Sequence, residues 1–447
     1  MSNKGNIKSS FSASELIQES HDIVPLVRVR NSTKSLTGFP FKSNLYTDKG
    51  IKLVRGINVK EGVLDWNDVA FWPELTREIK KYLLQSGDVV IQMDGSKVGK
   101  NYAYIEASDL PLLLLQRVTR LRPANGLNSR FLYYNFASTR FFDWVSTIKT
   151  DPLVPHISLK DIENFEIHNF SPSEQTAIAE YLDTKTQAID RKVSLLEKKI
   201  GYYQELRKSL INETVTKGLD KNAELQTNEL GFATPKNWLR YRLKDLGALY
   251  SGLSGKSGDD FNQDDNPDNK GFIPFTNIAN NTYLKRDHLG TVVVYEGEKQ
   301  NRVRKGDIFF LMSSEGYEDI GKSAALAEDI EETYLNSFCK GYRVNPRKTN
   351  PYFLNYLMLS DYYRQLLIVE GKGFTRINLK MEKVNDFLVY IPDTLSAQDE
   401  IVKFLDAKLD TIAKIISNIQ TQITTLKELR KALINDVVTG KIKVSHE

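Results

Sequence analysis

The side chains in this sequence that could do chemistry are basic, hydroxyl and amide residues in loops beside predicted strands. Lys and Arg can neutralise phosphates or bind guanine edges, and Asn can bind an adenine edge through two hydrogen bonds. In the first half of the chain the candidates are Lys42, Ser43, Arg55, Asn58, Lys97, Lys100 and Asn101. Comparable loops of the second half contain Lys256, Asn277, Asn281, Lys372 and Arg376. For any one of them a solvated surface position is the better interpretation, but as groups in corresponding loops they suggest a nucleic-acid surface.

Two short passages resemble enzyme motifs but lack the residues that those motifs require. Residues 255–257 read Gly-Lys-Ser, like the end of a phosphate-binding loop, yet Tyr250 stands where that loop needs its first glycine. Residues 350–352 read Asn-Pro-Tyr, whereas adenine methyltransferases carry an Asn-Pro-Pro-Tyr type of motif, and no Pro-Pro pair occurs in this chain. A helix start, with Asn350 as N-cap and Pro351 at the first helical position, is the ordinary interpretation. Neither passage predicts catalysis.

Metal, thiol and cofactor chemistry are not indicated either. The histidines are scattered, with no pair at metal-ligand spacing: His21, His156, His168, His288 and His446. Cys339 lies in a partly apolar stretch, where a buried structural thiol is the better interpretation than a nucleophile. Carboxylates are abundant, but none is singled out as an acid–base pair. The sequence predicts a chain without catalytic residues, metal ligands or a cofactor of its own.

One passage occurs twice, and it must form the element that positions the loops. Residues 205–216 read ELRKSLINETVT, and residues 428–439 read ELRKALINDVVT, an offset of 223. The same offset relates Gln175, Ile178, Leu182, Asp183 and Ile189 to Gln398, Ile401, Leu405, Asp406 and Ile412. A constant offset over some forty residues indicates two copies of one helical element without internal insertions.

Each copy carries an apolar stripe with the 4-3 spacing of a coiled coil. The stripe residues are Ile189, Val193, Leu196, Ile200, Tyr203, Leu409, Ile412, Ile416, Ile419, Ile423 and Leu426. Because a lone helix would leave this stripe wet, we expect the two copies to pack on each other. Two helices that are each buried in a domain of their own remain the alternative.

The segments before the two helices correspond as well, though less closely. Residues 87–93 parallel 306–312 as a Gly-Asp turn followed by a buried strand, residues 131–134 parallel 353–356 as a short aromatic helix, and 157–160 parallel 377–380. We therefore expect an α+β fold with a pseudo-two-fold internal repeat, in which two mixed α/β domains are joined by two long helices. The expected segments are a polar tail 1–14, a first domain 15–172, a helix 173–217, a linker 218–236, a second domain 237–394, a helix 395–439 and a tail 440–447.

Bulk composition restricts the class of protein. A chain of 447 residues, 40% hydrophobic and 26% charged, should fold into two or three domains. One cysteine, a polar start without a signal-peptide pattern and no long apolar run indicate the cytoplasm and no membrane partner. The net charge of +4, from 61 basic and 57 acidic residues, is only mildly basic. DNA binding would therefore need locally clustered charge or a partner that supplies phosphate contacts.

The doubled helix resembles the DNA specificity subunits of type I restriction–modification systems, and the resemblance covers nearly the whole chain. Helices of that family open with a Gln-containing turn like residues 173–179 and 395–401, and close like residues 210–218 and 433–440. The first segment is also typical, with Gly38, residues 41–43, Tyr46, Gly50 and Arg55 placed as the family often has them. The doubled helix end is the specific part of the match.

The resemblance implies a non-catalytic reader of double-stranded DNA. Each recognition domain would read one half of a split site, and an antiparallel helix pair would set the gap between the halves. Two methyltransferase (modification) subunits, which bind S-adenosylmethionine, would dock beside the half-sites. Motor–nuclease (restriction) subunits that use ATP and Mg²⁺ could join them, so these cofactors would belong to the partners. The resemblance does not extend to the bases that are read.

Two other classes of function remain open from the sequence. One is a coiled-coil interaction protein whose α/β domains bind other proteins and not DNA. The other is a single-chain nuclease or methyltransferase with an unrecognised site, which predicts metal- or S-adenosylmethionine-dependent activity from the purified chain alone. One repeated scaffold with two different sets of loops favours the specificity subunit over both.

Overall fold

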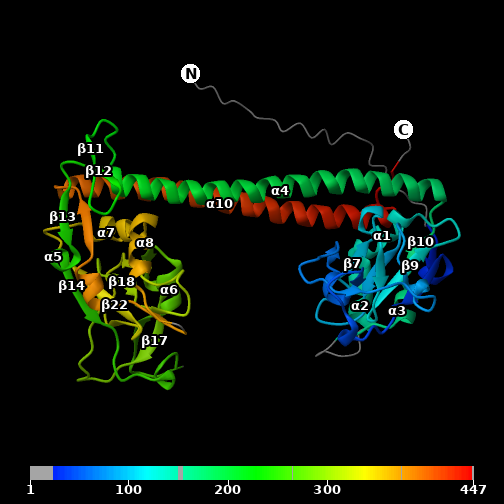
Figure 1. The fold of residues 1–447 in the computed structure, drawn as a ribbon, viewed down its shortest axis with the longest axis horizontal. Coiled ribbons are helices and arrows are strands. Elements are labelled where there is room, and N and C mark those ends of the chain that lie inside the picture. The colour runs from blue at the N-terminus through cyan, green and yellow to red at the C-terminus, as the bar shows by residue number, and fades with distance from the viewer. Residues whose placement is uncertain (1–23, 149–154, 264, 374, 445–447) are drawn as a thin grey trace. The chain divides into compact units, whose positions relative to one another are not determined.

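The computed structural model describes residues 24–148, 155–263, 265–373 and 375–444 (Figure 1). The chain forms two compact units, one from Met1–Glu197 with Gln420–Glu447 and the other from Lys198–Ile419. We call them the first and the second unit. The expected polar tail 1–14 and the end of the tail 440–447 lie outside the described residues.

The first unit is built on a five-stranded sheet. Its strands lie in the order β2 (Thr33–Thr37), β9 (Val118–Pro123), β6 (Val89–Gln92), β7 (Tyr102–Tyr104) and β4 (Glu61–Gly62). A smaller sheet has the order β5 (Phe71–Trp72), β3 (Ile51–Val54) and β8 (Leu112–Leu114), and β1 (Leu26–Arg28) pairs with β10 (Glu166–His168). The helices of the domain are α1 (Ser129–Ala137), α2 (Thr139–Ile148) and α3 (Leu159–Asn164).

Strand β6 is apolar at Val89, Val90 and Ile91 because both faces of the main sheet are covered there. Val89 and Ile91 join the core that contains α1, whereas Val90, between them, joins the core that contains β8. Successive side chains of a strand point to opposite faces, so a strand covered on both sides needs apolar residues at every position. In the second unit, β18 shows the same division, with Ile308 and Phe310 in one core and Phe309 in the other.

The second unit repeats this architecture strand for strand. Its main sheet has the order β14 (Gly247–Ser251), β22 (Cys339–Val344), β18 (Ile308–Leu311), β20 (Ser323–Leu326) and β16 (Tyr283–Leu284). The smaller sheet has the order β17 (Gly290–Val293), β15 (Asn269–Ile273) and β21 (Thr333–Leu335), and β13 (Leu239–Arg242) pairs with β24 (Leu388–Ile391). The helices are α5 (Leu243–Leu246), α6 (Phe275–Asn280), α7 (Pro351–Leu359), α8 (Asp361–Glu370) and α9 (Met381–Asn385).

Two strand pairs distinguish the second unit from the first. Strands β19 (Ser313–Ser314) and β23 (Ile377–Asn378) pair where the first unit has a single bridge between Asp94 and His156. The segment 218–236, expected as a linker, contains a hairpin of β11 (Leu225–Thr227) and β12 (Ala233–Pro235). Phe232 in this hairpin is buried in the second core. The hairpin is therefore anchored to the domain that follows it.

Two long helices, α4 (Pro172–Lys217) and α10 (Leu395–Val438), cover the passages expected to be helical, and each has residues in both units. In the first unit, Arg430 forms an ion pair with Asp190 at 3.0 Å and Lys427 with Glu197 at 3.4 Å. The partner number falls on α10 as it rises on α4, so the helices run antiparallel. This confirms the expected fold class. Within the described residues, no helix combines the length and apolar character needed to cross a membrane.

The predicted stripe lies toward the interior of this helix pair. Its buried members are Val193, Leu409, Ile412, Ile419 and Ile423. The half-buried members are Ile189, Leu196, Ile200, Tyr203, Ile416 and Leu426. Burial is deepest where the helices meet the domains, at Leu182 in the first core and Leu405 in the second.

Candidate nucleic-acid interface

The turn after β6 presents two of the candidate lysines to solvent. Lys97 and Lys100 are exposed, and Lys100 Nζ lies 4.5 Å from the centre of the Phe142 ring. Gly99 adopts a φ of +81°, and a Cβ there would lie 2.9 Å from the Cβ of Val145 on α2. The turn therefore needs glycine at this position to pass close to α2. This turn therefore holds the ammonium groups of Lys97 and Lys100 at the surface, where they can contact an anion.

Lys42 and Ser43 occupy a second exposed position in the first unit. Both side chains are exposed at the start of the short 3-10 helix Ser43–Leu45, and Lys42 makes no side-chain capping bond there. Phe41, just before them, is buried beside Leu53 of β3. The buried ring thus fixes the loop while its polar residues face outward.

Arg55 and Asn58 are engaged with each other inside the first unit. Arg55 Nε donates to Asn58 Oδ1 at 3.2 Å, and Arg55 Nη2 pairs with the Asp68 carboxylate at 2.8 Å. Asn58 is 1% exposed and its Nδ2 donates to the carbonyl oxygens of Asp65 and Asp68. These side chains hold together the loop that follows β3. Base contact by Asn58 would require the loop to open.

Asn101 and Lys256 are also engaged within their units. Asn101 is buried and donates to Gln92 Oε1 at 2.6 Å. The Lys256 side chain is 6% exposed and pairs with Glu298 at 2.7 Å, with its Nζ 5.3 Å from the centre of the Tyr295 ring. The hydrogen bond from Lys256, with that from the Tyr295 backbone N–H, lowers the pKa of Glu298 below its usual value. Both candidates have a structural role here.

The remaining candidates of the second unit lie on α6 and on the loop after α8. Asn277 donates to the carbonyl of His288, and Asn281 Nδ2 donates to the carbonyl of Asn277 at 2.8 Å. Lys372 and Arg376 are exposed, and the Arg376 guanidinium lies 5.2 Å from the centre of the exposed Phe338 ring. An exposed cation stacked on an exposed ring is suited to contact a base or a phosphate.

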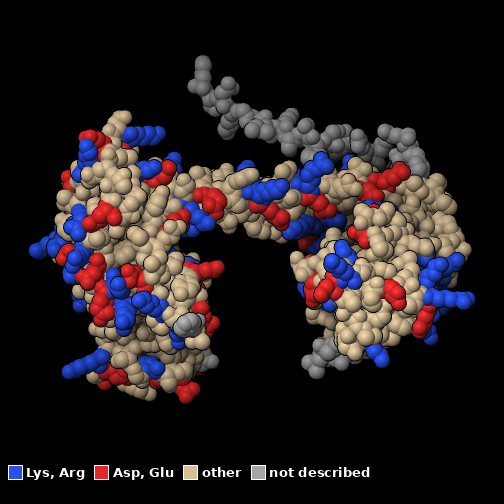
Figure 2. All heavy atoms as spheres, viewed as in Figure 1, with Lys and Arg blue, Asp and Glu red and all other residues tan. Residues whose placement is uncertain are grey.

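Among the described candidates, side-chain hydrogen bonds join Arg55 to Asn58 and Asn281 to Asn277, and backbone hydrogen bonds join Lys97 to Lys100 and Asn101. The exposed candidates that could meet a ligand directly are Lys42, Ser43, Lys97, Lys100, Lys372 and Arg376. Figure 2 shows Lys and Arg interspersed with Asp and Glu over both units. On the face in view, any phosphate contact would therefore come from small local groups, in keeping with the mild net charge.

A repeated glutamine holds each domain to its long helix, a role that the sequence did not reveal. Gln175 Oε1 accepts from the Asn128 backbone N–H at 2.9 Å, and Gln398 Oε1 accepts from that of Asn350 at 2.8 Å. Asn128 and Asn350 cap α1 and α7 with their side chains. Each glutamine also donates to a carbonyl just before its own helix. The starts of the short and the long helix are therefore fixed together.

The repeated Leu-Asp pair forms a second clamp. Tyr134 of α1 donates its hydroxyl to Asp183 at 2.6 Å, and Tyr356 of α7 donates to Asp406 at 2.6 Å. Burial raises the pKa of both tyrosines, so both hydroxyls keep the proton that they donate. The leucine before each aspartate is fully buried. Repetition of the pair at a fixed offset was the signal that could have identified it.

The repeated asparagine of the LIN passage forms a third clamp, this time to the next domain helix. Asn212 donates to the Asp361 carboxylate at 2.8 Å and accepts from the Asp361 backbone N–H at 2.7 Å, at the start of α8. In the first unit, Asn435 accepts from the Thr139 hydroxyl at 3.0 Å, at the start of α2. Each unit is therefore held by the start of one long helix and the end of the other.

The aspartate of each Gly-Asp turn is a buried structural anion. Asp88 receives two hydrogen bonds of 2.7 Å from Arg122, and Asp307 receives bonds of 3.1 and 2.7 Å from Arg343. Cys339 is fully buried, and burial raises the pKa of its thiol to about 12. In the described part of the chain, no group of three or more His, Cys, Asp and Glu side chains could hold a metal. The structure assigns these residues to the framework.

A family model described as the type I restriction modification DNA specificity domain matches residues 35–199 and 235–425. The chain belongs to this family. The matched ranges cover both units and most of both long helices, as the repeated framework requires. Members of the family are non-catalytic specificity subunits, and this chain is a DNA-recognition protein of that kind. The resemblance expected from the doubled helix is confirmed.

Individual specificity subunits are similar to this chain over different lengths. The EcoAI specificity subunit of Escherichia coli is 34% identical over 160 residues, which are 35% of this chain and 27% of that protein. The EcoBI specificity subunit of the same species is 23% identical over 91% of this chain and 84% of that protein. The MjaVIII specificity subunit of Methanocaldococcus jannaschii is 21% identical over 82% of each.

Two solved structures share the fold. One, from a study of assembly and conformational transition of the type I R-M system, has a TM-score of 0.71 at 15% identity, covering 94% of this chain and 98% of that one. The HsdS subunit from Thermoanaerobacter tengcongensis has a TM-score of 0.54 at 14% identity, covering 94% and 97%. At such identities the likeness concerns the fold alone.

Proposed function

We propose that this chain is the specificity subunit of a type I restriction–modification complex whose two units each read one half of a split double-stranded DNA site. The observation that carries the proposal is the repeat of one sheet topology with different loops. The loop after β6 carries Lys97 and Lys100, whereas the equivalent loop after β19 carries Glu315, Glu318 and Asp319. One framework with unlike loop chemistry is suited to two unlike half-sites.

In this proposal the helix pair sets the gap between the half-sites. Helix α4 has 46 residues and α10 has 44, both continuous. The clamps at Gln175 and Asn212 attach the two ends of α4 to different units. Because an α-helix rises about 1.5 Å per residue, its length is a fixed spacer.

Methyltransferase subunits would dock on this helix pair, with motor–nuclease subunits added where the system cleaves DNA. Leu206 and Leu429 support docking, because they are equivalent repeat positions and are 50% and 54% exposed. Exposed leucines at related positions are suited to two copies of one partner. S-adenosylmethionine, ATP and Mg²⁺ would bind to those partners in the cytoplasm, and this chain would select the DNA sequence at which they act.

The decisive experiment is methylome sequencing of cells that carry this chain with its methyltransferase partner. We expect methylated adenine in a two-part motif with a fixed gap, and loss of the motif when this chain is deleted. An active methyltransferase that produces no such motif, or the same motif without this chain, would overturn the proposal.

Two engineered chains separate reading from spacing. Inserting seven residues into both helices, next to Ile200 and Ile416, preserves the phase of the stripe and lengthens each helix by about 10.5 Å, roughly three base pairs. We expect a longer gap between unchanged half-sites. Exchanging residues 24–148 for those of another specificity subunit should change one half-site only. A change of both half-sites in either experiment would contradict the two-reader arrangement.

A further inference from the structure

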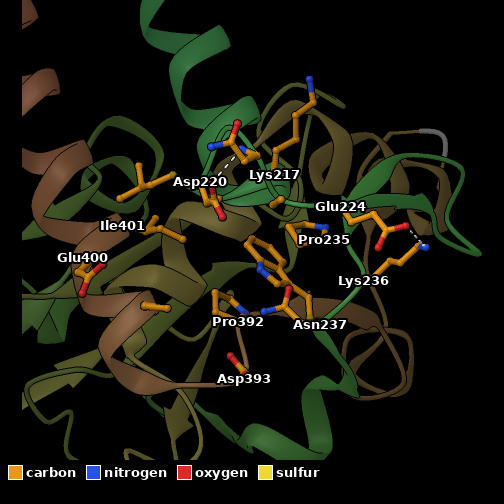
Figure 3. A pocket seen from close by; sticks show the side chains of 16 residues that line it. Lys217, Asp220, Glu224, Pro235, Lys236, Asn237, Pro392, Asp393, Glu400 and Ile401 are labelled. Carbon is orange, nitrogen blue, oxygen red and sulfur yellow. Dashed lines mark hydrogen bonds and ion pairs between the residues drawn. The ribbon is translucent and has the colours of Figure 1, made fainter.

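A cavity of about 550 Å³ lies in the second unit, where α4 ends and α10 begins (Figure 3). Gly218, with a φ of +75°, ends α4, and the chain then forms the β11–β12 hairpin before it enters β13. The apolar part of the wall comes from Trp238, Ile401, Pro235 and Pro392. None of the candidate DNA-binding residues lines this cavity.

The polar wall of the cavity has an excess of carboxylates. The acidic side chains are Asp220, Glu224, Asp393 and Glu400, and the basic ones are Lys217 and Lys236. Glu224 is neutralised by an ion pair with Lys236. Asp393 and Glu400 are exposed members of the lining and form no side-chain hydrogen bond or ion pair with the described residues (Figure 3). A wall of this sign repels a DNA phosphate and attracts a cation.

Trp238 adds a hydrogen-bond donor that lacks an acceptor. The residue is 8% exposed and packs against Phe353, with ring centres 6.2 Å apart. Its indole Nε1–H donates to no described residue, yet it is not among the side-chain atoms sealed from solvent. A tryptophan in such a position normally finds a partner for this N–H. The cavity thus offers one donor beside two free carboxylates.

The equivalent place in the first unit is filled. There α10 ends near Gly440, where a Cβ would lie 3.0 Å from the Phe170 ring. Ile442 follows, packs against the first core and donates its backbone N–H to the carbonyl of Asp436 at 3.1 Å. After α10, therefore, Ile442 returns the chain to the first core.

We propose that this cavity receives an extended segment of one methyltransferase subunit, carrying an arginine or lysine. The cation would lie between Asp393 and Glu400, and a main-chain carbonyl of the same segment would accept from Trp238 Nε1. A peptide supplies the acceptor and the cation together, and the cavity volume accommodates a few residues. The inference rests on the proposed function for the identity of the partner, and it makes the two docking positions unequal.

The test is native mass spectrometry of the full chain with its methyltransferase at sub-micromolar concentration. For the wild-type chain we expect two methyltransferase copies per chain. For the D393N/E400Q double variant we expect binding of one copy to weaken at least 10-fold, so that one copy per chain predominates. W238F keeps the ring but removes the donor, and it should weaken the same copy about fivefold. These exposed carboxylates and the conservative tryptophan change leave the core intact.

The matched control is E296Q/D329N, which removes the same charge from exposed positions outside the cavity wall. It should retain two copies. Equal occupancy for D393N/E400Q and the control would overturn the inference, and so would an equal loss of both copies by D393N/E400Q. If the wild-type chain bound no methyltransferase at all, the proposed function itself would fail, which is a distinguishable result.

Discussion

The two units share their framework down to individual hydrogen bonds, but they differ in one pair of facing residues in the main sheet. Arg120 on β9 lies opposite Leu36 on β2, whereas the equivalent Gly341 on β22 lies opposite Tyr250 on β14. Tyr250 reaches across the glycine and donates to Asp307 at 2.6 Å. Arg120 leaves its buried Nε without an acceptor. The framework is thus constant where it contacts the long helices and variable within the sheet.

This contrast shows where the fold tolerates change. The clamps made by Gln175, Asp183 and their equivalents join elements that are far apart in sequence. Loss of one clamp would weaken the attachment of a domain to its long helix, whereas an exchange within the sheet needs only one compensating neighbour. Variation within the sheets is therefore compatible with a constant pair of long helices.

The largest expected effect comes from removing the glycine that makes the second unit different. A Cβ at Gly341 would lie 2.1 Å from the ring of Tyr250, which its bond to Asp307 holds in place. We expect Gly341→Ala to destabilise the second unit by about 3 kcal/mol. Hydrogen-exchange mass spectrometry would show faster exchange in β14 and β22 and little change in β2 and β9.

The rescue variant places a leucine at position 250 of the second unit, because the first unit has a leucine at the equivalent position. Tyr250→Leu in the Gly341→Ala background should recover most of the lost protection, because Leu36 occupies that position in the first unit. If the double variant were no better than Gly341→Ala, the contrast between the sheets would not rest on this pair.

The glutamine clamps should contribute about equally to the stability of the two units. Gln175→Leu and Gln398→Leu each leave a half-buried backbone N–H without its acceptor, at a cost of about 1 to 2 kcal/mol. Gln398→Leu should cost slightly more, because Gln398 also accepts from the Thr349 hydroxyl. Each loss should show as faster exchange at the start of α1 or α7 only. A variant that loosened both units would show that the clamps do not act locally.

Removal of the tyrosine clamps should destabilise the two units by different but smaller amounts. Within the described residues, Tyr134→Phe leaves Asp183 only its longer ion pair with Arg130, at 3.4 Å, whereas Tyr356→Phe leaves Asp406 a second donor in Tyr283, at 2.9 Å. We expect a loss of about 1 kcal/mol for Tyr134→Phe and less for Tyr356→Phe. Thermal unfolding with exchange readouts for each unit would measure both. The reverse order would contradict the assigned bonding.

At alkaline pH we also expect a pH dependence of stability in the second unit. Burial raises the pKa of Cys339 to about 12, above the value of an unfolded thiol. The native state therefore keeps a proton that the unfolded state loses above about pH 9, so this contribution to stability falls as pH rises from there toward 12. For Cys339→Ala, the free energy of unfolding measured between pH 8 and 10.5 should lack this fall with pH. A thiol reagent should also react with Cys339 only after the protein has unfolded.

Much of the framework could be predicted because its signals are local. Residues 87–93 were expected as a turn followed by a buried strand and contain β6, and Asn350 caps α7 as its position before Pro351 suggested. The two helices followed from a long 4-3 spacing. The hairpin within 218–236 escaped prediction, because its polar composition hides Phe232, whose burial depends on the core of the next domain.

The candidate interface was less predictable, because availability of a side chain depends on distant partners. Nothing near Lys256 in the sequence indicates Glu298, and nothing near Asn58 indicates that it caps a loop ending at Asp68. Lys97 and Lys100 kept their exposure because a glycine-containing turn carries them past α2. Loop position thus predicted some exposed cations, while hydrogen-bonding geometry decided the others.

The closing of the first unit by the last part of the chain has a consequence for synthesis. Ile434, Val437 and Val438 complete the core around Ile178 and Leu182, yet they leave the ribosome after all of Lys198–Ile419. The second unit is contiguous and can fold as it emerges. The first unit must wait with an incomplete core until translation ends. The unit made first is therefore the one finished last, and its complete core exists only when residues 434–438 have been translated.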